Sequence, residues 1–186
     1  IAWSVNNKDW HSIGPEHAFL KSDYGTWGPE KRMVSPYVYR DTNGLCHCIW
    51  SVNEKDGVFS YTTSKDLIYW KTQSYPVVSP ENCLMPEISS DGNKFIITWL
   101  SGNGEKVWLI STSDFKNYGK AQLSTAAKRV NGRKTLEVNG EMQMGTVHKV
   151  LFKEVDNLIK SQQIAAYRSD LHSERITDDA KKYANL

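Results

Sequence analysis

The sequence predicts a mainly β protein that contains part of a β-propeller, because one module of short strands and tight turns occurs almost twice. The first copy contains Ser35-Pro36-Tyr37 and Trp50, and the second contains Met85-Pro86-Glu87 and Trp99. Corresponding positions are 49 or 50 residues apart. A repeat of about 50 residues, made of short strands, is typical of propeller blades, which have four strands each.

The first copy predicts four strands, and glycine-containing turns separate the first three. The turn sequences are Asn43-Gly44 and Asp56-Gly57, both strong hairpin signals. The four strands are expected at residues 33–39, 45–52, 57–63 and 67–73. Residues 1–12 resemble the end of a preceding blade.

The second copy repeats this order of strands and turns. Its turns contain Asp91-Gly92 and Gly102-Asn103-Gly104. Its strands are expected at residues 84–89, 94–100, 105–111 and 117–123. A Ser-x-Asp phrase ends the third strand of each copy, and we align Ser64 with Ser113 there. We interpret the phrase as structural, because Ser and Asp side chains bond nearby backbone N–H groups and fix turns.

The chain divides by sequence character at about residue 120. Residues 1–120 are expected to hold the end of one blade plus two blades, and residues 121–186 a mixed tail. The tail predicts a hairpin at about 133–147 and helices at about 151–168 and 178–184. Because known propellers close with at least four blades, we interpret the chain as part of a longer parent protein. The alternatives are completion by a second copy and capping by the tail.

The composition excludes several classes of partner. Charged residues make up 24% of the 186 residues and the net charge is +2, without a basic run that would indicate nucleic acid or a membrane surface. We also expect no membrane insertion, because no apolar run approaches the roughly 20 residues required. Cys46, Cys48 and Cys83 lack the spacing of a zinc site, so neither metal nor cofactor is expected.

Glu87 is the candidate catalytic residue. If Pro36 and Pro86 lie on the innermost strands, Glu87 borders the central channel beside Ser35 and Tyr37. A carboxyl group in such an enclosed site is disposed to donate a proton, which suits a general acid. Glycoside hydrolysis needs such an acid together with a second carboxylate. The alternative is an ordinary strand-end glutamate that faces water.

Four phrases carry a resemblance to a known family. They are Met33–Val38, Asn43–Trp50, Tyr61–Trp70 and Met85–Ile88. In order and spacing they resemble the five-bladed propeller glycosidases of glycoside hydrolase family 43, the arabinofuranosidases and β-xylosidases, over roughly residues 1–120.

The resemblance implies that Glu87 is the general acid. It also implies an aspartate that tunes this acid at the position of Ser35, and a catalytic base that would precede Ile1. The catalytic set is therefore incomplete in this chain, and whether the chain is an enzyme is open. By the same resemblance, the protein is expected to be secreted or periplasmic.

The sequence thus supports two functions of different classes. The first is a glycosidase-like propeller that acts on arabinose- or xylose-containing plant polysaccharide, with activity weak or absent in this chain alone. The second is a non-catalytic carbohydrate-binding or accessory module, and a structural propeller fragment is a third option. An oligosaccharide or polysaccharide is the expected partner of the first two. The expected substrate-binding residues are Ser35, Tyr37, Trp50, Trp99 and His148, the last of which has a solvent-facing strand histidine as its alternative.

Overall fold

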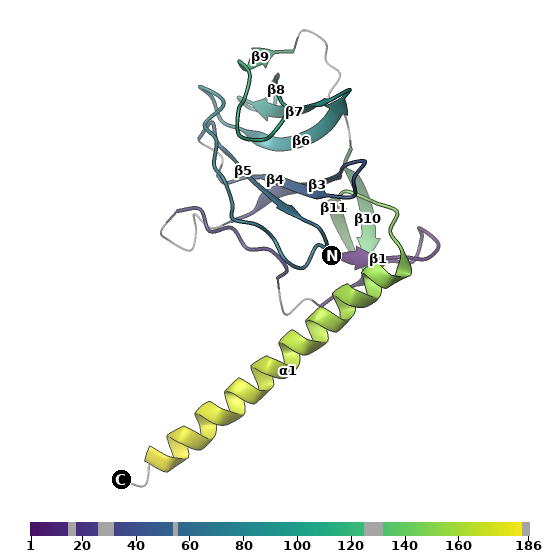
Figure 1. Cartoon of the computed structure of the whole chain (residues 1–186), viewed down its shortest axis with the longest axis vertical. Coiled ribbons are helices and arrows are strands. Elements are labelled where there is room, and N and C mark those ends of the chain that lie inside the picture. Colours follow the sequence, from purple (N-terminus) through teal and green to yellow (C-terminus); the bar gives the residue numbers. More distant parts are fainter. Residues whose placement is uncertain (15–17, 26–31, 54–55, 125–131, 184–186) are drawn as a thin grey trace. The chain divides into compact units, whose positions relative to one another are not determined.

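The computed structural model describes residues 1–14, 18–25, 32–53, 56–124 and 132–183. These residues are mainly β, as expected, and form several small sheets and one helix (Figure 1). The chain forms two compact units. The sheet unit consists of Leu20–Leu136 and Gln143–His148, and the helix unit consists of Ile1–Phe19, Glu137–Met142 and Lys149–Leu186.

The first sheet of the sheet unit contains β3 (Val34–Arg40), β4 (Cys46–Ser51) and β5 (Phe59–Ser64). The strands are antiparallel and follow one another in sequence order. The fourth strand expected at 67–73 is replaced by isolated bridges along β5, such as Ser64 to Trp70.

The second sheet contains all four expected strands. They are β6 (Leu84–Asp91), β7 (Lys94–Ser101), β8 (Lys106–Thr112) and the two-residue β9 (Gln122–Leu123). These strands are also antiparallel and in sequence order. The sheet has the number and order of strands expected from the second copy, whereas the described residues do not close a propeller ring.

Each of the two sheets has a β-bulge in its first strand, at corresponding positions. In β3 the pairing register with β4 shifts between Val34 and Tyr37, and in β6 it shifts between Leu84 and Glu87. Ser35 has φ 50° and Met85 has φ 47°, which are unusual values for residues with side chains. A proline follows each of them and cannot donate to the strand ladder, which fits a bulge.

The distance in sequence between corresponding residues of the two copies decreases along the module. Tyr37 and Glu87 are 50 residues apart, and Trp50 and Trp99 are 49 apart. Five residues separate the paired Arg40 and Cys46, whereas four separate the corresponding pair, Ser90 and Phe95.

The next hairpin is also one residue shorter in the second copy, because six residues separate the paired Leu100 and Val107 against seven between the paired Ser51 and Phe59. Ser64 therefore corresponds to Thr112, 48 residues on, and its alignment with Ser113 was wrong.

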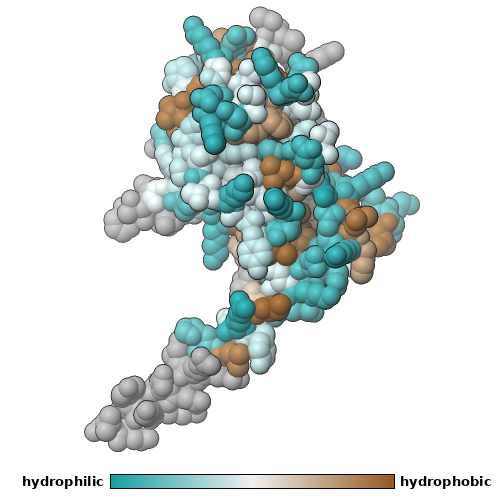
Figure 2. All heavy atoms as spheres, viewed as in Figure 1, coloured by the Kyte–Doolittle hydropathy of each residue, from teal (hydrophilic) through white to brown (hydrophobic). Residues whose placement is uncertain are grey.

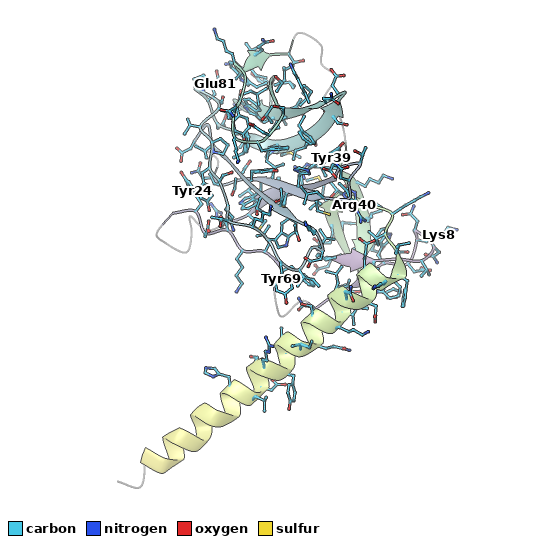
Figure 3. The ribbon with its side chains drawn as sticks, in the orientation of Figure 1. Lys8, Tyr24, Tyr39, Arg40, Tyr69 and Glu81 are labelled. Carbon is cyan, nitrogen blue, oxygen red and sulfur yellow. The ribbon has the colours of Figure 1, made fainter. Side chains whose placement is uncertain are left out.

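The hydrophobic core of the sheet unit contains side chains from both sheets. Ile49 and Phe59 come from the first sheet, and Ile97 and Trp99 come from the second, and all four have 0% exposure. At the edge of this core, Tyr39 of β3 donates a hydrogen bond of 2.9 Å to Ser90 of β6 (Figure 3).

The hairpin expected in the tail is present. It consists of β10 (Lys134–Val138) and β11 (Glu141–Gly145). Asn139 and Gly140 form its turn with φ 52° and 83°, the left-handed conformations that a tight hairpin turn requires.

The helix unit contains the two-residue strands β1 (Ala2–Trp3) and β2 (His11–Ser12) and one long helix, α1 (Phe152–Tyr183). A Cβ at Gly14 would lie 2.4 Å from Gln162 Oε1, so α1 packs directly against the backbone at Gly14.

The two helices expected at 151–168 and 178–184 are one continuous helix in the structure. Residues 169–177 contain neither proline nor glycine, so the sequence holds no strong helix breaker between them. The last expected helical residue, Ala184, lies outside the described residues.

Among the described residues, no helix combines the length and hydropathy needed to cross a bilayer. Figure 2 shows hydrophobic side chains in small separate groups among hydrophilic ones on the viewed face.

Candidate functional site

Glu87 lies directly after the bulge of β6, and its side chain is buried. It is 2% exposed, so the alternative of a glutamate that faces water is wrong. Its Oε1 lies 3.2 Å from Nε of Arg133, whose side chain is 3% exposed. The candidate carboxyl group therefore faces a buried guanidinium group.

Arg133 also contacts backbone oxygens of both bulges. Nη1 donates a hydrogen bond of 2.6 Å to the carbonyl of Pro36. Nη2 donates to the carbonyls of Ser35 and Pro86, at 2.8 and 2.9 Å. One side chain thus connects the first strands of the two sheets.

The bulges explain why these carbonyl groups are available. A bulge leaves one residue of its strand without a ladder partner, and its unpaired backbone groups need another partner when they are buried. Ser35-Pro36 and Met85-Pro86 are the bulged pairs. The repeat therefore supplies the same backbone feature twice, and the two copies converge on Arg133.

Tyr37 completes the surroundings of the guanidinium group. The guanidinium carbon lies 5.1 Å from the centroid of its ring, within the range of a cation–π interaction. A Cβ at Gly132 would lie 2.0 Å from the Tyr37 hydroxyl oxygen. A side chain at residue 132 would therefore clash, and glycine allows the backbone next to Arg133 to approach.

Glu87 and Arg133 form a buried pair of opposite charges. The neighbouring guanidinium group favours the charged form of the carboxyl group, whereas burial favours its neutral form. The same guanidinium lies near Cys48, whose pKa is raised to about 12 by burial despite the opposing effect of Arg133. In this arrangement Glu87 can accept hydrogen bonds and balance a cation, whereas proton donation requires its neutral form.

The structure brings together three of the expected site residues. Ser35, Tyr37 and Glu87 all contact Arg133. Ser35 makes this contact through its carbonyl oxygen. The contact therefore does not depend on the serine side chain.

The other expected site residues lie elsewhere. Trp50 and Trp99 occupy corresponding positions in β4 and β7 and are 0% exposed, so their rings are not available to stack on a sugar as expected. His148 is exposed, and its Nε2 lies 3.0 Å from the carbonyl oxygen of Val38 in β3.

Sequence reasoning missed Arg133, because the residue lies in a stretch with no motif. It is 97 residues from Pro36 and 47 from Pro86 along the chain. The available signal was local: a glycine directly before an arginine that begins an expected hairpin.

Sequence reasoning also missed His47, which is 3% exposed in an aromatic cluster between the sheets. Its Nδ1 lies 2.8 Å from the Tyr61 hydroxyl, and its Nε2 lies 3.4 Å from a carboxylate oxygen of Asp41. Its ring stacks on Phe115 at 4.9 Å between centroids. Burial lowers the pKa of His47, and Asp41 offsets part of this effect.

The described residues contain no cluster of three or more His, Cys, Asp or Glu side chains that could hold a metal ion. Two surface depressions, of about 210 and 540 Å³, lie at the turn end of the first sheet. Tyr69 lines the smaller one and is 79% exposed (Figure 3). Both depressions are lined by Leu45 and Lys65.

Comparisons with known proteins found partial structural similarity. No family model matches the sequence, and no curated protein matches it. An endo-arabinase from Bacteroides thetaiotaomicron VPI-5482 is 14% identical with a TM-score of 0.40, covering 57% of this chain and 42% of that one. An α-L-arabinofuranosidase from Clostridium thermocellum ATCC 27405 is 12% identical with a TM-score of 0.37, covering 59% and 39%. The chain spans about two fifths of the length of each.

Proposed function

We propose that the chain is part of a glycoside hydrolase-like propeller that acts on arabinose- or xylose-containing plant polysaccharide, with Glu87 as its general acid. The observation that carries this proposal is a carboxyl group with 2% exposure, placed by a β-bulge on the first strand of its sheet. Buried carboxyl groups with a specific charge partner, next to strained backbone, occur preferentially at functional sites.

In this proposal Arg133 opposes catalysis while its guanidinium group lies beside the carboxyl group of Glu87. An ionised Glu87 cannot protonate a leaving group, and its burial keeps a substrate away. Proton donation therefore requires the guanidinium group to move away from the carboxyl group. The rate expected from the chain alone is low for this reason, and also because Ser35 stands where the resembling enzymes carry a second carboxylate.

The test is hydrolysis of p-nitrophenyl α-L-arabinofuranoside and p-nitrophenyl β-D-xyloside by the full chain. We expect slow release of p-nitrophenol that depends on Glu87, so Glu87→Gln reduces the rate at least tenfold. Glu105→Gln is the matched control, because Glu105 is exposed in the loop between β7 and β8. The enzyme proposal fails if wild type releases no p-nitrophenol, or if Glu87→Gln and wild type are equally fast.

A second candidate is a non-catalytic carbohydrate-binding or accessory module. The exposed ring of Tyr69 beside a surface depression favours it, because sugars stack on accessible aromatic rings rather than on buried ones. Calorimetric titration with arabino- and xylo-oligosaccharides tests this candidate. Saturable binding that is lost in Tyr69→Ala supports it, with Tyr167→Ala as the control for another exposed tyrosine, on α1. Binding that Tyr69→Ala leaves unchanged contradicts it.

A further inference from the structure

We propose that Glu87, Tyr37 and the carbonyl groups of the two bulges form a guanidinium-binding site, which Arg133 fills from within the chain. The site joins the first strands of the two sheets. This inference does not depend on the proposed hydrolysis, because it concerns the chemical class of ligand that the group around Glu87 accepts.

The acceptors surround the guanidinium group on its edges. The carboxylate of Glu87 lies beside Nε, the carbonyl of Pro36 accepts from Nη1, and the carbonyls of Ser35 and Pro86 accept from Nη2. Each of the three nitrogens of one planar group therefore has an oxygen near it. A guanidinium group carries five donors in a fixed plane, whereas an ammonium group is a compact point charge with three donors.

An aromatic ring adds a further contact with the guanidinium group. The guanidinium carbon lies over the ring of Tyr37, 5.1 Å from its centroid, and the tyrosine is 6% exposed. Gly132 leaves room for this ring, since a Cβ there would overlap the hydroxyl group. Acceptors for all three nitrogens, together with an aromatic ring over the central carbon, match a guanidinium ligand.

The electrostatics of the site also favour a cationic ligand. The groups described above, a carboxylate, three carbonyl oxygens and the face of an aromatic ring, all attract positive charge. The two charged side chains are only 2–3% exposed, so these interactions are weakly screened. An anion would be repelled, and a neutral sugar would leave Glu87 without a countercharge.

Chemical complementation tests the proposal. Arg133→Ala removes the internal ligand and leaves the acceptors in place, so we expect a lower melting temperature. Methylguanidinium on the order of 10 mM, far below denaturing concentrations, should then raise the melting temperature of Arg133→Ala in a saturable way. Wild type should not respond, because its site is already filled.

Three controls separate specific binding from general effects of salt. Methylammonium chloride at the same ionic strength should not raise the melting temperature of Arg133→Ala. The double variant Arg133→Ala/Glu87→Gln should lose the response to methylguanidinium, because the carboxylate is gone. Arg168→Ala, which removes an exposed arginine from α1, should neither lower the melting temperature nor create a response.

The proposal is overturned if methylguanidinium has no saturable effect on Arg133→Ala, or if wild type or the double variant responds equally. It is also overturned if methylammonium serves as well. Should Arg133→Ala fail to fold, the same titration is followed by circular dichroism as recovery of structure, and an absence of recovery counts against the site. Arg133→Lys provides a folded alternative, expected to be less stable than wild type although the charge is kept.

Discussion

The hydroxyl oxygens of Ser64 and Thr112 occupy the same position in the two modules. Each accepts a hydrogen bond from the backbone N–H three residues further on, that of Leu67 or Phe115, and both bonds measure 2.9 Å. Leu67 and Phe115 have φ 63° and 54°, so each turn passes through the left-handed region at a residue with a large side chain. The hydroxyl groups hold a backbone conformation that these residues would otherwise avoid.

Loss of either hydroxyl group should therefore destabilise the sheet unit. We expect Ser64→Ala and Thr112→Val each to lower the free energy of unfolding by about 1 kcal/mol, as for the loss of a helix cap. Thr112→Ser keeps the hydroxyl and should lose less. Urea unfolding followed by tryptophan fluorescence measures the difference, and equal stability of Thr112→Val and wild type would show that the bond contributes nothing.

The carboxyl group of Asp114 predicts a loss of stability in acid. Hydrogen bonds from the backbone N–H groups of Asn117 and Lys116, and from the Asn117 side chain, lower its pKa to about 2. A carboxyl group with a lowered pKa binds fewer protons in the folded state, so its stabilisation is present above about pH 4 and is lost as pH falls towards 2. Urea unfolding from pH 5 to pH 2 should show a weaker dependence on pH in Asp114→Asn, and an unchanged dependence contradicts this role.

His47 predicts a different effect, at higher pH. Because burial lowers its pKa, the folded state binds fewer protons than the unfolded state below about pH 6.5, and stability falls as pH drops from 7 to 5. His47→Gln should flatten this part of the profile. His172→Gln, an exposed histidine on α1, should leave the profile as it is. A profile for His47→Gln that parallels wild type would mean that His47 does not titrate on unfolding.

Gly132→Ala tests how closely the chain approaches Tyr37. The added Cβ would lie 2.0 Å from the tyrosine hydroxyl and 2.8 Å from the ring carbon that bears it. We expect a loss of about 1–3 kcal/mol of stability, with partial recovery in Gly132→Ala/Tyr37→Phe, because the closer contact is removed. Gly145→Ala is the control, since nothing lies within 4 Å of its added Cβ. If both alanine variants are equally stable, the approach at residue 132 is looser than described.

The strands could be predicted from the sequence because their signals are local. Asn43-Gly44, Asp91-Gly92 and Asn139-Gly140 each mark a turn between strands that the structure contains. The helix boundaries could not be predicted from local signals. Thr177-Asp178-Asp179 is typical of a helix start and favours a separate helix at 178–184, but the same residues can also lie within a helix, and Thr177 lies inside α1.

The site could be predicted only in part, because burial and long-range partners leave little trace in a single sequence. Glu87 and Tyr37 were identified through their positions in the repeat, which the bulges preserve. Arg133 follows them by more than 40 residues in the sequence, after residues 125–131, and carries no motif. Trp50 and Trp99 illustrate the same problem, because an aromatic side chain fits a sugar site and a protein core equally well.

The shortening of the repeat, from 50 to 49 to 48 residues, has a consequence for engineering. Each missing residue lies between two paired positions of a hairpin, and the flanking pairs correspond in the two copies. The two modules therefore suit the exchange of hairpin segments. We expect the second sheet to accept residues 41–45 in place of residues 91–94, because the flanking pair Arg40 and Cys46 corresponds to Ser90 and Phe95.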